Sequence, residues 1–224
     1  VANLPFSGFL GGIAENYKSN FIYNGTEISV LEADEYDRSF LNLSPDWAIV
    51  TSIDADHLDI YGDTETIEQG FRDFADLVPE SDHLFIRKGI QIGRAAKTYA
   101  VNEEADFYSD NIREIGDKIY FDFHTPTQEI EDFVWEIPGI HNVENATVAI
   151  AILNNLGVDF ETLKSGIANF KGIKRRYTKH NFDSGKIYID DYAHHPTELN
   201  AVIGSIKTFY PHKKLLVVFQ PHLF

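Results

Sequence analysis

The sequence has no cysteine, no methionine, few basic residues and no long apolar run. Without cysteine, disulfides and thiolate-bound metals are excluded, which is compatible with a reducing compartment. No apolar stretch approaches the roughly 20 residues of a membrane span and no signal peptide opens the chain, so we expect a cytoplasmic protein with no membrane partner. Either Val1 is not the natural start or methionines are missing from the sequence, and we expect a fragment of a longer protein.

Basic side chains are scarce relative to acidic ones. The chain has 19 Lys and Arg against 35 Asp and Glu, which gives a formal net charge of −16. Nucleic-acid binding depends on neutralising phosphates with Lys and Arg, so a nucleic-acid partner is not expected. A nucleotide ligand would need a metal ion or a local basic cluster to screen the repulsion.

What is present indicates a globular α/β protein. The 224 residues, 43% of them hydrophobic and 24% charged, suffice for one large domain or one and a half smaller ones with a sizeable core. Short apolar runs alternate with amphipathic stretches. The expected strands cover residues 27–32, 47–53, 83–87, 118–123, 132–137, 176–182, 186–190 and 214–220, of which the first two and the last are expected to be buried. The expected helices cover residues 64–77, with Thr64 or Thr66 as the cap, 142–156, 160–170 and 197–209.

A new unit is expected after Gly172. There, strand 186–190, helix 197–209 and strand 214–220 form a β-α-β pattern, which implies parallel pairing and a right-handed crossover.

Two of the expected strands end in clusters of carboxylates. Glu32 opens the cluster after strand 27–32, and His57 lies in the acidic segment after strand 47–53. If these strands are neighbours, both side chains meet at one edge of the sheet, where ligands of open parallel sheets bind. Oxygen ligands suit Mg²⁺, although His57 could instead contact a phosphate. The plainer interpretation of the cluster that begins at Glu32 is a solvated acidic loop.

The segment LEADEYDRSFLNLSPDWAIVTSIDADHLDIYG, residues 31–62, resembles the central domain of the Mur ligase family. In that family an E-A-D-E stretch is followed by a strand that ends in A-D-H-x-D. The resemblance implies that Glu32 and His57 are metal ligands, and that they hold the Mg²⁺ ions that bridge ATP and the acyl-phosphate.

Residues 141–145, His-Asn-Val-Glu-Asn, open the helix that follows Pro138. Asn142 could be an ordinary N-cap. The H-N-x-x-N pattern, however, is similar to the family element that contacts adenine, which implies nucleotide-binding roles for His141, Asn142 and Asn145. Asn142 and Asn145 are one helical turn apart and would share a face.

The main basic cluster is Lys174-Arg175-Arg176. Such a run is usually a solvated linker. In Mur ligases the similar G-x-x-R-R element marks the hinge to the C-terminal domain, which implies that Arg176 reaches the nucleotide and takes part in catalysis. A planar guanidinium suits this role because it pairs with two phosphate oxygens and keeps its charge.

The stretch from Asp190 to Glu198, DDYAHHPTE, is the most specific motif. Two adjacent histidines beside two aspartates could suggest zinc, but adjacent side chains point in different directions and no third ligand is obvious. The stretch is similar to the D-D-Y-x-H-H-P-T-E block of the Mur ligases that add L-alanine. That likeness implies that Asp191 contacts the nucleotide and that His194 lies near the reacting groups.

Taken together, the resemblance implies a central ATP-binding domain over residues 1–173, with a mostly parallel sheet and a small antiparallel sheet, and the start of a Rossmann-like C-terminal domain over residues 174–224. It implies ATP-dependent amide formation between UDP-N-acetylmuramate and L-alanine, with ATP and Mg²⁺. The family's Gly-rich phosphate loop is not in these residues, so we expect this chain alone to be inactive.

Three alternatives stay open. A murein-recycling ligase would add a whole peptide to the same sugar nucleotide, although the A-D-H-L-D-I-Y segment and Glu198 favour the alanine-adding members. A non-catalytic α/β binding module and a zinc metallohydrolase are the rivals from other classes.

Overall fold

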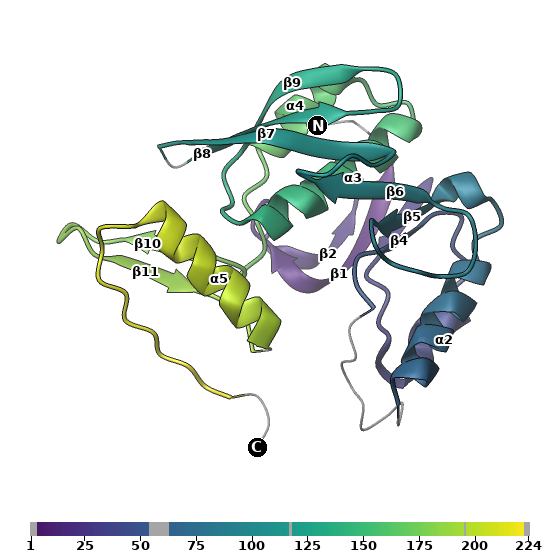
Figure 1. The fold of residues 1–224 in the computed structure, drawn as a ribbon, viewed down its shortest axis with the longest axis horizontal. Helices are drawn as coiled ribbons and strands as arrows, with labels where there is room; N and C mark the ends of the chain where they lie inside the picture. The colour runs from purple at the N-terminus through teal and green to yellow at the C-terminus, as the bar shows by residue number, and fades with distance from the viewer. Residues whose placement is uncertain (1–3, 54–62, 117, 195, 222–224) are drawn as a thin grey trace.

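The computed structural model describes residues 4–53, 63–116, 118–194 and 196–221, and Figure 1 shows their arrangement. They form a mixed α/β fold, as predicted. The sheets have the orders β2-β1-β3, β4-β5-β6-β7-β8-β9 and β10-β11. Within the described residues, no helix is both long and apolar enough to cross a membrane.

The six-stranded sheet is the centre of the structure. Its strands are β4 (Ala48–Val50), β5 (Leu84–Arg87), β6 (Lys97–Val101), β7 (Phe107–Ile115), β8 (Lys118–His124) and β9 (Glu129–Trp135). Strands β4 to β7 pair in parallel, whereas β7, β8 and β9 pair antiparallel. The expected strand 132–137 is therefore confirmed, but it begins and ends earlier than the sequence indicated.

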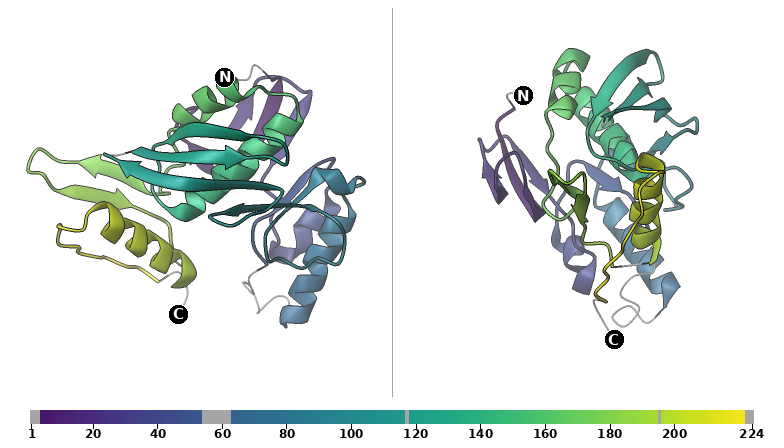
Figure 2. Two further views of the ribbon diagram at one scale, coloured as in Figure 1. Left: turned by 45° about the horizontal axis from the view of Figure 1, so that its top comes forward. Right: turned by 90° about the vertical axis from the view of Figure 1, so that its left-hand side faces the viewer.

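Two helices cover this sheet. Helix α3 (Ile140–Asn155) packs on β6 and β7, and α4 (Phe160–Ala168) packs on β9. Figure 2 shows both helices between the six-stranded sheet and the three-stranded sheet. Their core is aromatic, with Phe121, Phe123 and Phe133 fully buried. The burial of each such ring contributes roughly 2 kcal/mol to the free energy of folding, which stabilises the sheet on which α3 packs.

Helix α2 (Thr64–Asp76) covers a second core cluster beside β4 and β5. Apolar residues at a spacing of three to four predicted this helix, and Ile67 and Phe74 are indeed buried. The predicted cap, Thr64 or Thr66, is wrong. Asp63 is the N-cap, because its carboxylate accepts a hydrogen bond from the Thr66 backbone N–H at 2.8 Å.

The first sheet contains β1 (Phe6–Ala14), β2 (Ser19–Tyr23) and β3 (Ile28–Leu31). Strand β1 pairs parallel with β3 and antiparallel with β2. The prediction that 27–32 is a buried strand is half right: the strand exists, but Val30 and Leu31 are 48% and 50% exposed. The pairing of β3 with β1 makes β3 an edge strand, and β4 belongs to the other sheet. The two acid-tipped strands are therefore not hydrogen-bonded neighbours among the described residues, contrary to expectation.

The C-terminal unit contains β10 (Thr178–Asn181), β11 (Ile187–Asp190) and α5 (Pro196–Phe209). Strands β10 and β11 form an antiparallel hairpin, which α5 follows (Figure 1). The expected buried strand 214–220 is absent. Leu216 and Val218 are 84% and 92% exposed in an extended segment that pairs with no described strand, so the predicted β-α-β unit does not form here. An apolar run becomes a buried strand only where a partner strand exists.

The segment that leads to this unit is fastened to the end of β1. The Glu15 N–H donates to the Gly172 carbonyl at 2.9 Å, and the Lys174 N–H donates to the Ile13 carbonyl at 2.9 Å. The methyl Cγ2 of Ile173 lies where a Cβ on Gly12 would be, only 2.4 Å away. A glycine at residue 12 is therefore needed for the approach of residue 173.

Candidate functional site

Arg176 lies near the start of the C-terminal unit, in an unusual backbone segment. Its neighbours Arg175 and Tyr177 both have left-handed conformations, with φ of 61° and 54°. Non-glycine residues rarely adopt such angles unless surrounding contacts impose them. Here the Arg175 N–H donates to Thr178 Oγ1 at 2.8 Å, and the Tyr177 N–H donates to Asp191 Oδ2 at 2.7 Å. These contacts determine the direction in which Arg176 leaves the backbone.

Asp191 lies directly after β11, and both of its carboxylate oxygens accept hydrogen bonds from backbone N–H groups. Its Oδ1 accepts from the Ala193 N–H at 2.7 Å while Oδ2 holds Tyr177. The Tyr192 N–H in turn donates to the Arg175 carbonyl at 2.8 Å. Each carboxylate oxygen has two lone pairs, so these bonds leave acceptor capacity for a hydroxyl group. The predicted nucleotide contact of Asp191 stays a prediction, but its structural role is clear from the geometry.

His194 and Arg176 share one partner, Glu198 in the first turn of α5. Glu198 Oε1 accepts from Arg176 Nη1 at 3.3 Å, and Oε2 accepts from the His194 N–H at 3.1 Å. The His194 Nδ1 lies 3.0 Å from the Tyr192 carbonyl. Because a carbonyl oxygen can only accept, Nδ1 is the donor in this contact.

The start of α3 lies close to this group. A Cβ on Gly139 would lie 2.6 Å from Cε1 of His141 and 3.1 Å from Oγ of Ser205, so the first turn of α3 meets α5 there. Gly139 has a φ of 106°, which favours glycine, and it is the N-cap of α3. The N-cap interpretation of Asn142 is therefore wrong, because the helix begins at Ile140.

The ionisation of His141 reflects its surroundings. Desolvation lowers the pKa of its imidazole below the ordinary 6.5, and the charge of Arg176 acts in the same direction, while Asp191, Glu144 and Glu198 oppose it. The ring is consequently neutral at pH 7. The same interactions show that the predicted adenine element and the predicted hinge elements lie within electrostatic reach of one another.

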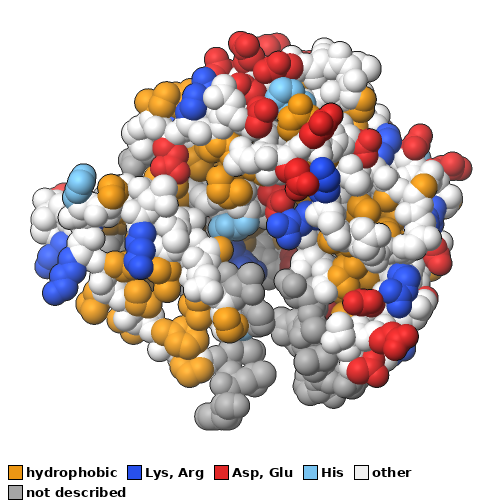
Figure 3. Space-filling view, viewed as in Figure 1, with side chains coloured by type: hydrophobic (Ala, Val, Ile, Leu, Met, Phe, Trp, Pro, Cys, Tyr) orange, Lys and Arg blue, Asp and Glu red, His pale blue; other side chains and the backbone are white. Residues whose placement is uncertain are grey.

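The two asparagines of this element lie differently. The side-chain amide of Asn142 donates to the Pro138 carbonyl at 2.6 Å, whereas Asn145 is exposed one turn later. Figure 3 shows the surface hollowed between the C-terminal unit and the lobe that contains α2, with a histidine and basic side chains at its upper end.

Glu32 lies at the tip of β3 with an exposed side chain. Its Oε2 accepts from the Gly11 N–H at 2.6 Å, and a Cβ on Gly11 would lie 2.7 Å from that oxygen. A glycine at residue 11 thus lets the carboxylate approach the β1 backbone. His57, the other predicted metal ligand, lies outside the described residues, so the structure does not test their proximity.

The chemistry of these residues fits a magnesium ion in part. Mg²⁺ takes few protein ligands and completes its shell with water and phosphate oxygens, so one exposed carboxylate such as Glu32 is a suitable anchor. A zinc site of the kind considered for His194 and its neighbours has no counterpart among the described residues, where no three acidic, histidine or cysteine side chains are grouped for a metal.

Sequence reasoning missed the roles of Gly11, Gly12 and Glu198. The signal for Glu198 was present, because a Glu three residues into a helix commonly bonds back to the backbone at the helix start. The glycines offered no signal by themselves, since the need for glycine arises from Glu32 and Ile173, which are distant in sequence.

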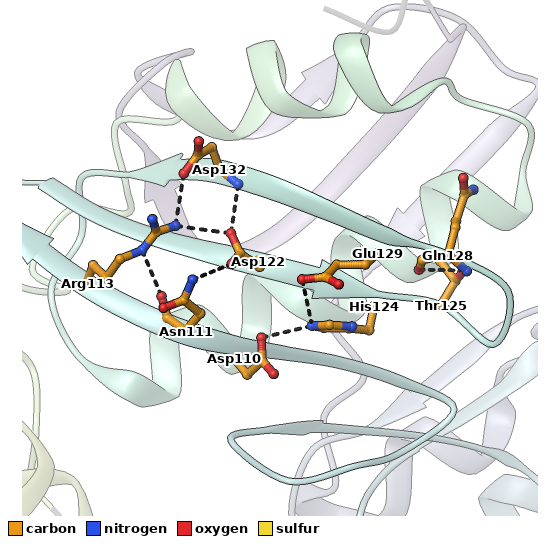
Figure 4. A network of polar contacts seen from close by, with 9 residues as sticks. All are labelled: Asp110, Asn111, Arg113, Asp122, His124, Thr125, Gln128, Glu129 and Asp132. Carbon is orange, nitrogen blue, oxygen red and sulfur yellow. Dashed lines mark hydrogen bonds and ion pairs between the residues drawn. The ribbon is translucent and has the colours of Figure 1, made fainter.

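A separate polar network joins side chains on β7, β8 and β9, the antiparallel strands of the six-stranded sheet (Figure 4). Asp122 is 4% exposed, and its carboxylate accepts from Asn111 Nδ2 at 2.5 Å, Arg113 Nη2 at 3.1 Å and the Asp132 N–H at 2.9 Å. Burial tends to raise the pKa of Asp122, but the hydrogen bonds from Asp132 and Asn111 and the charge of Arg113 outweigh it and lower the pKa below 3.8. The pairing register shifts near Asp122 both between β7 and β8 and between β8 and β9. The carboxylate therefore binds the Asp132 backbone amide at a β-bulge.

Comparison with known proteins relates this chain to one family. A model of the Mur ligase middle domain matches residues 15–153, and a model of the Mur ligase glutamate ligase domain matches residues 175–222. The chain is 46% identical over 218 residues to the UDP-N-acetylmuramate–L-alanine ligase of Flavobacterium psychrophilum, covering 97% of this chain and 48% of that protein. The corresponding ligase of Christiangramia forsetii is 45% identical over 218 residues, with 97% and 48% covered.

Solved structures agree in fold. The UDP-N-acetylmuramate–alanine ligase of Thermotoga maritima superposes with a TM-score of 0.84 at 24% identity, covering 97% of this chain and 51% of that one. MurF from Acinetobacter baumannii gives a TM-score of 0.72 at 21% identity, with 90% and 48% covered. The chain spans about half the length of the curated relatives it matches. By the family model that covers more than half of its residues, this chain belongs to the Mur ligase family.

Proposed function

We propose that the protein of which this chain is a part is an ATP-dependent ligase that joins L-alanine to the carboxylate of UDP-N-acetylmuramate. The observation that carries the proposal is the approach of His141, in the segment matched by the middle-domain model, to Arg176, Asp191 and Glu198, in the segment matched by the second model. Relatives at 45–46% identity that bear this activity in their names support the choice of substrates.

The proposed reaction proceeds through an acyl-phosphate. The carboxylate attacks the γ-phosphorus of ATP and ADP leaves, and the alanine amine then attacks the activated carbonyl, loses a proton and displaces phosphate. This chemistry requires positioning and neutralisation of phosphate charge more than covalent catalysis. In a chain with a net charge of −16, the cation of Arg176 is a valuable partner for phosphate oxygens.

We assign each residue a part in this reaction. His141, neutral at pH 7, offers a ring face to adenine, and Asn142 and Asn145 line the same end of α3. Asp191 holds the Arg176 segment and accepts from a ribose hydroxyl. His194 presents Nε2 to the reacting groups.

Glu32, with His57 as the proposed second ligand, would hold Mg²⁺. A bound magnesium ion would neutralise phosphate charge at this position. We place the domain boundary between residues 173 and 174, in the segment that is hydrogen-bonded to the end of β1, and hinge closure there would deliver Arg176 to the nucleotide.

The test uses the product of the complete gene. Phosphate release is measured with UDP-N-acetylmuramate, ATP and Mg²⁺, with either L-alanine or a peptidoglycan tripeptide as the acceptor. Turnover with L-alanine is expected, whereas a preference for the tripeptide would point to a murein-recycling ligase, and no turnover with either would refute the ligase assignment. Arg176→Ala is expected to lower kcat/KM by about 100-fold, as removal of a charge-stabilising donor does, with Arg72→Ala on α2 as the matched control.

A further inference from the structure

Glu198 is the residue through which the two proposed catalytic side chains are connected. It lies in the first turn of α5, and its two carboxylate oxygens have different partners. Oε1 accepts from Arg176 Nη1 at 3.3 Å, and Oε2 accepts from the His194 N–H at 3.1 Å. The His194 Nδ1 is also within 3.7 Å of Oε2. One carboxylate therefore spans two residues that are 18 positions apart in the sequence.

We propose that Glu198 is a positioning residue that fixes the guanidinium of Arg176 relative to His194, so that both meet the bound nucleotide in one arrangement. The proposal rests on the nucleotide site proposed above. The backbone around Arg176 is already determined, because Asp191 and Thr178 bind its two neighbours. The remaining freedom lies in the long side chain, and that is where Glu198 acts.

A contribution to stability does not explain this contact. The side chains of Arg176 and Glu198 are 55% and 35% exposed, and exposed ion pairs stabilise a fold only slightly. A carboxylate near a phosphate site also repels the phosphate, so its presence beside Arg176 needs a compensating benefit. Preorganisation is such a benefit, since an ordered arginine loses less conformational entropy when it binds phosphate.

The contact with Glu198 leaves the Arg176 guanidinium able to bind phosphate. A guanidinium has five N–H donors, and the contact with Glu198 is made through Nη1. The planar fork can therefore bind phosphate oxygens while Glu198 holds one corner. Glutamate meets this requirement because it has two acceptor oxygens, whereas glutamine has one acceptor and would direct an NH₂ group at one of the two donors.

A double-mutant cycle tests the proposal in the complete protein. The dissociation constant of a non-hydrolysable ATP analogue with Mg²⁺ is measured by calorimetry for wild type, E198A, R176A and the double variant. E198A is expected to weaken binding about tenfold, and E198Q about threefold, when Arg176 is present, in line with the strength of charge-assisted hydrogen bonds. In the R176A background, E198A is expected to cause no further loss. The matched control is E161A, which removes an exposed first-turn glutamate from α4.

The outcomes separate the hypotheses. Additive losses in the double variant, or wild-type affinity in E198A, would overturn the positioning role. If E198A lowers the melting temperature, the cycle is run with E198Q, and additivity there overturns the proposal equally. A wild-type protein that does not bind the analogue contradicts both this role and the nucleotide site. A wild-type protein that binds it but does not ligate L-alanine contradicts only the proposed function.

Discussion

Replacement of Asp122 by alanine is expected to destabilise the sheet β7-β8-β9 strongly. The carboxylate is almost fully buried, and it accepts hydrogen bonds from Asn111, Arg113 and the Asp132 backbone (Figure 4). Alanine would leave three donors without this acceptor. A hydrogen bond to a charged group has a net value of about 1.5–3 kcal/mol, but Asn111 and Arg113 are partly exposed and can bind water instead, so the expected loss in the free energy of unfolding is about 3 kcal/mol in total.

Asp132→Asn provides the matched control, because Asp132 binds the same arginine from the surface. Its side chain is 61% exposed against 5% for Asp122, and it lies 2.9 Å from Arg113. Exposed ion pairs contribute about 0.5 kcal/mol. Asp132 has a φ of 60°, which asparagine also tolerates, so the substitution introduces no backbone strain.

The assay is urea unfolding followed by tryptophan fluorescence. Trp135 lies on β9 and reports this sheet, and Trp47→Phe removes the other of the two tryptophans. A loss of about 3 kcal/mol corresponds to a fall in Tm of about 6–12 °C for a chain of this size. Since the pKa of Asp122 is lowered by folding, its stabilisation is complete above pH about 4 and is lost as the pH falls through the folded-state pKa.

The difference between wild type and Asp122→Ala should therefore shrink below pH 4. Equal effects of the two substitutions, or a difference that does not change with pH, would refute the argument that a buried carboxylate holds the bulge together.

Three further predictions follow from the site. Gly12→Ala is expected to destabilise the protein by about 1–3 kcal/mol because its Cβ meets Ile173, and Ile173→Ala in the same chain should restore part of the loss in thermal unfolding. The imidazole of His141 is expected to titrate below pH 6.5 when followed by NMR. Because the unfolded state binds this proton more readily than the folded state, the free energy of unfolding falls as the pH drops below 6.5. His141→Gln should reduce this dependence of stability on pH. The 224 residues alone are expected to release no phosphate from ATP in the ligase assay, and measurable turnover would contradict the need for a phosphate loop.

Local patterns predicted most of the elements. The period of three to four in residues 64–77 was sufficient for α2, because the helix covers one apolar face whatever its neighbours are. The pattern did not reveal that β3 is exposed, or that residues 214–220 pair with no described strand. Both are short apolar runs, and the burial of such a run depends on which strand lies beside it, a property of the whole fold.

In the candidate site, too, some features could be predicted from local motifs and others depended on the whole fold. The motifs around His141, Arg176 and His194 predicted the candidate residues, and in the structure the charges of Arg176, Asp191 and Glu198 act on the imidazole of His141. The supposed adjacency of the Glu32 and His57 strands depended on sheet order, and the described strands belong to separate sheets. Sheet order is a long-range choice that no local spacing encodes.

By itself, the sequence determined the α/β class and the family, and it predicted the residues of a nucleotide site, because these depend on local periodicity, charge and motif chemistry. Only the tertiary structure decided that Glu198 joins Arg176 to His194, that Gly12 makes room for Ile173, and that Asp122 occupies a bulge. Each of these contacts joins residues whose separation in sequence carries no information about their distance in space, since packing of whole elements brings them together.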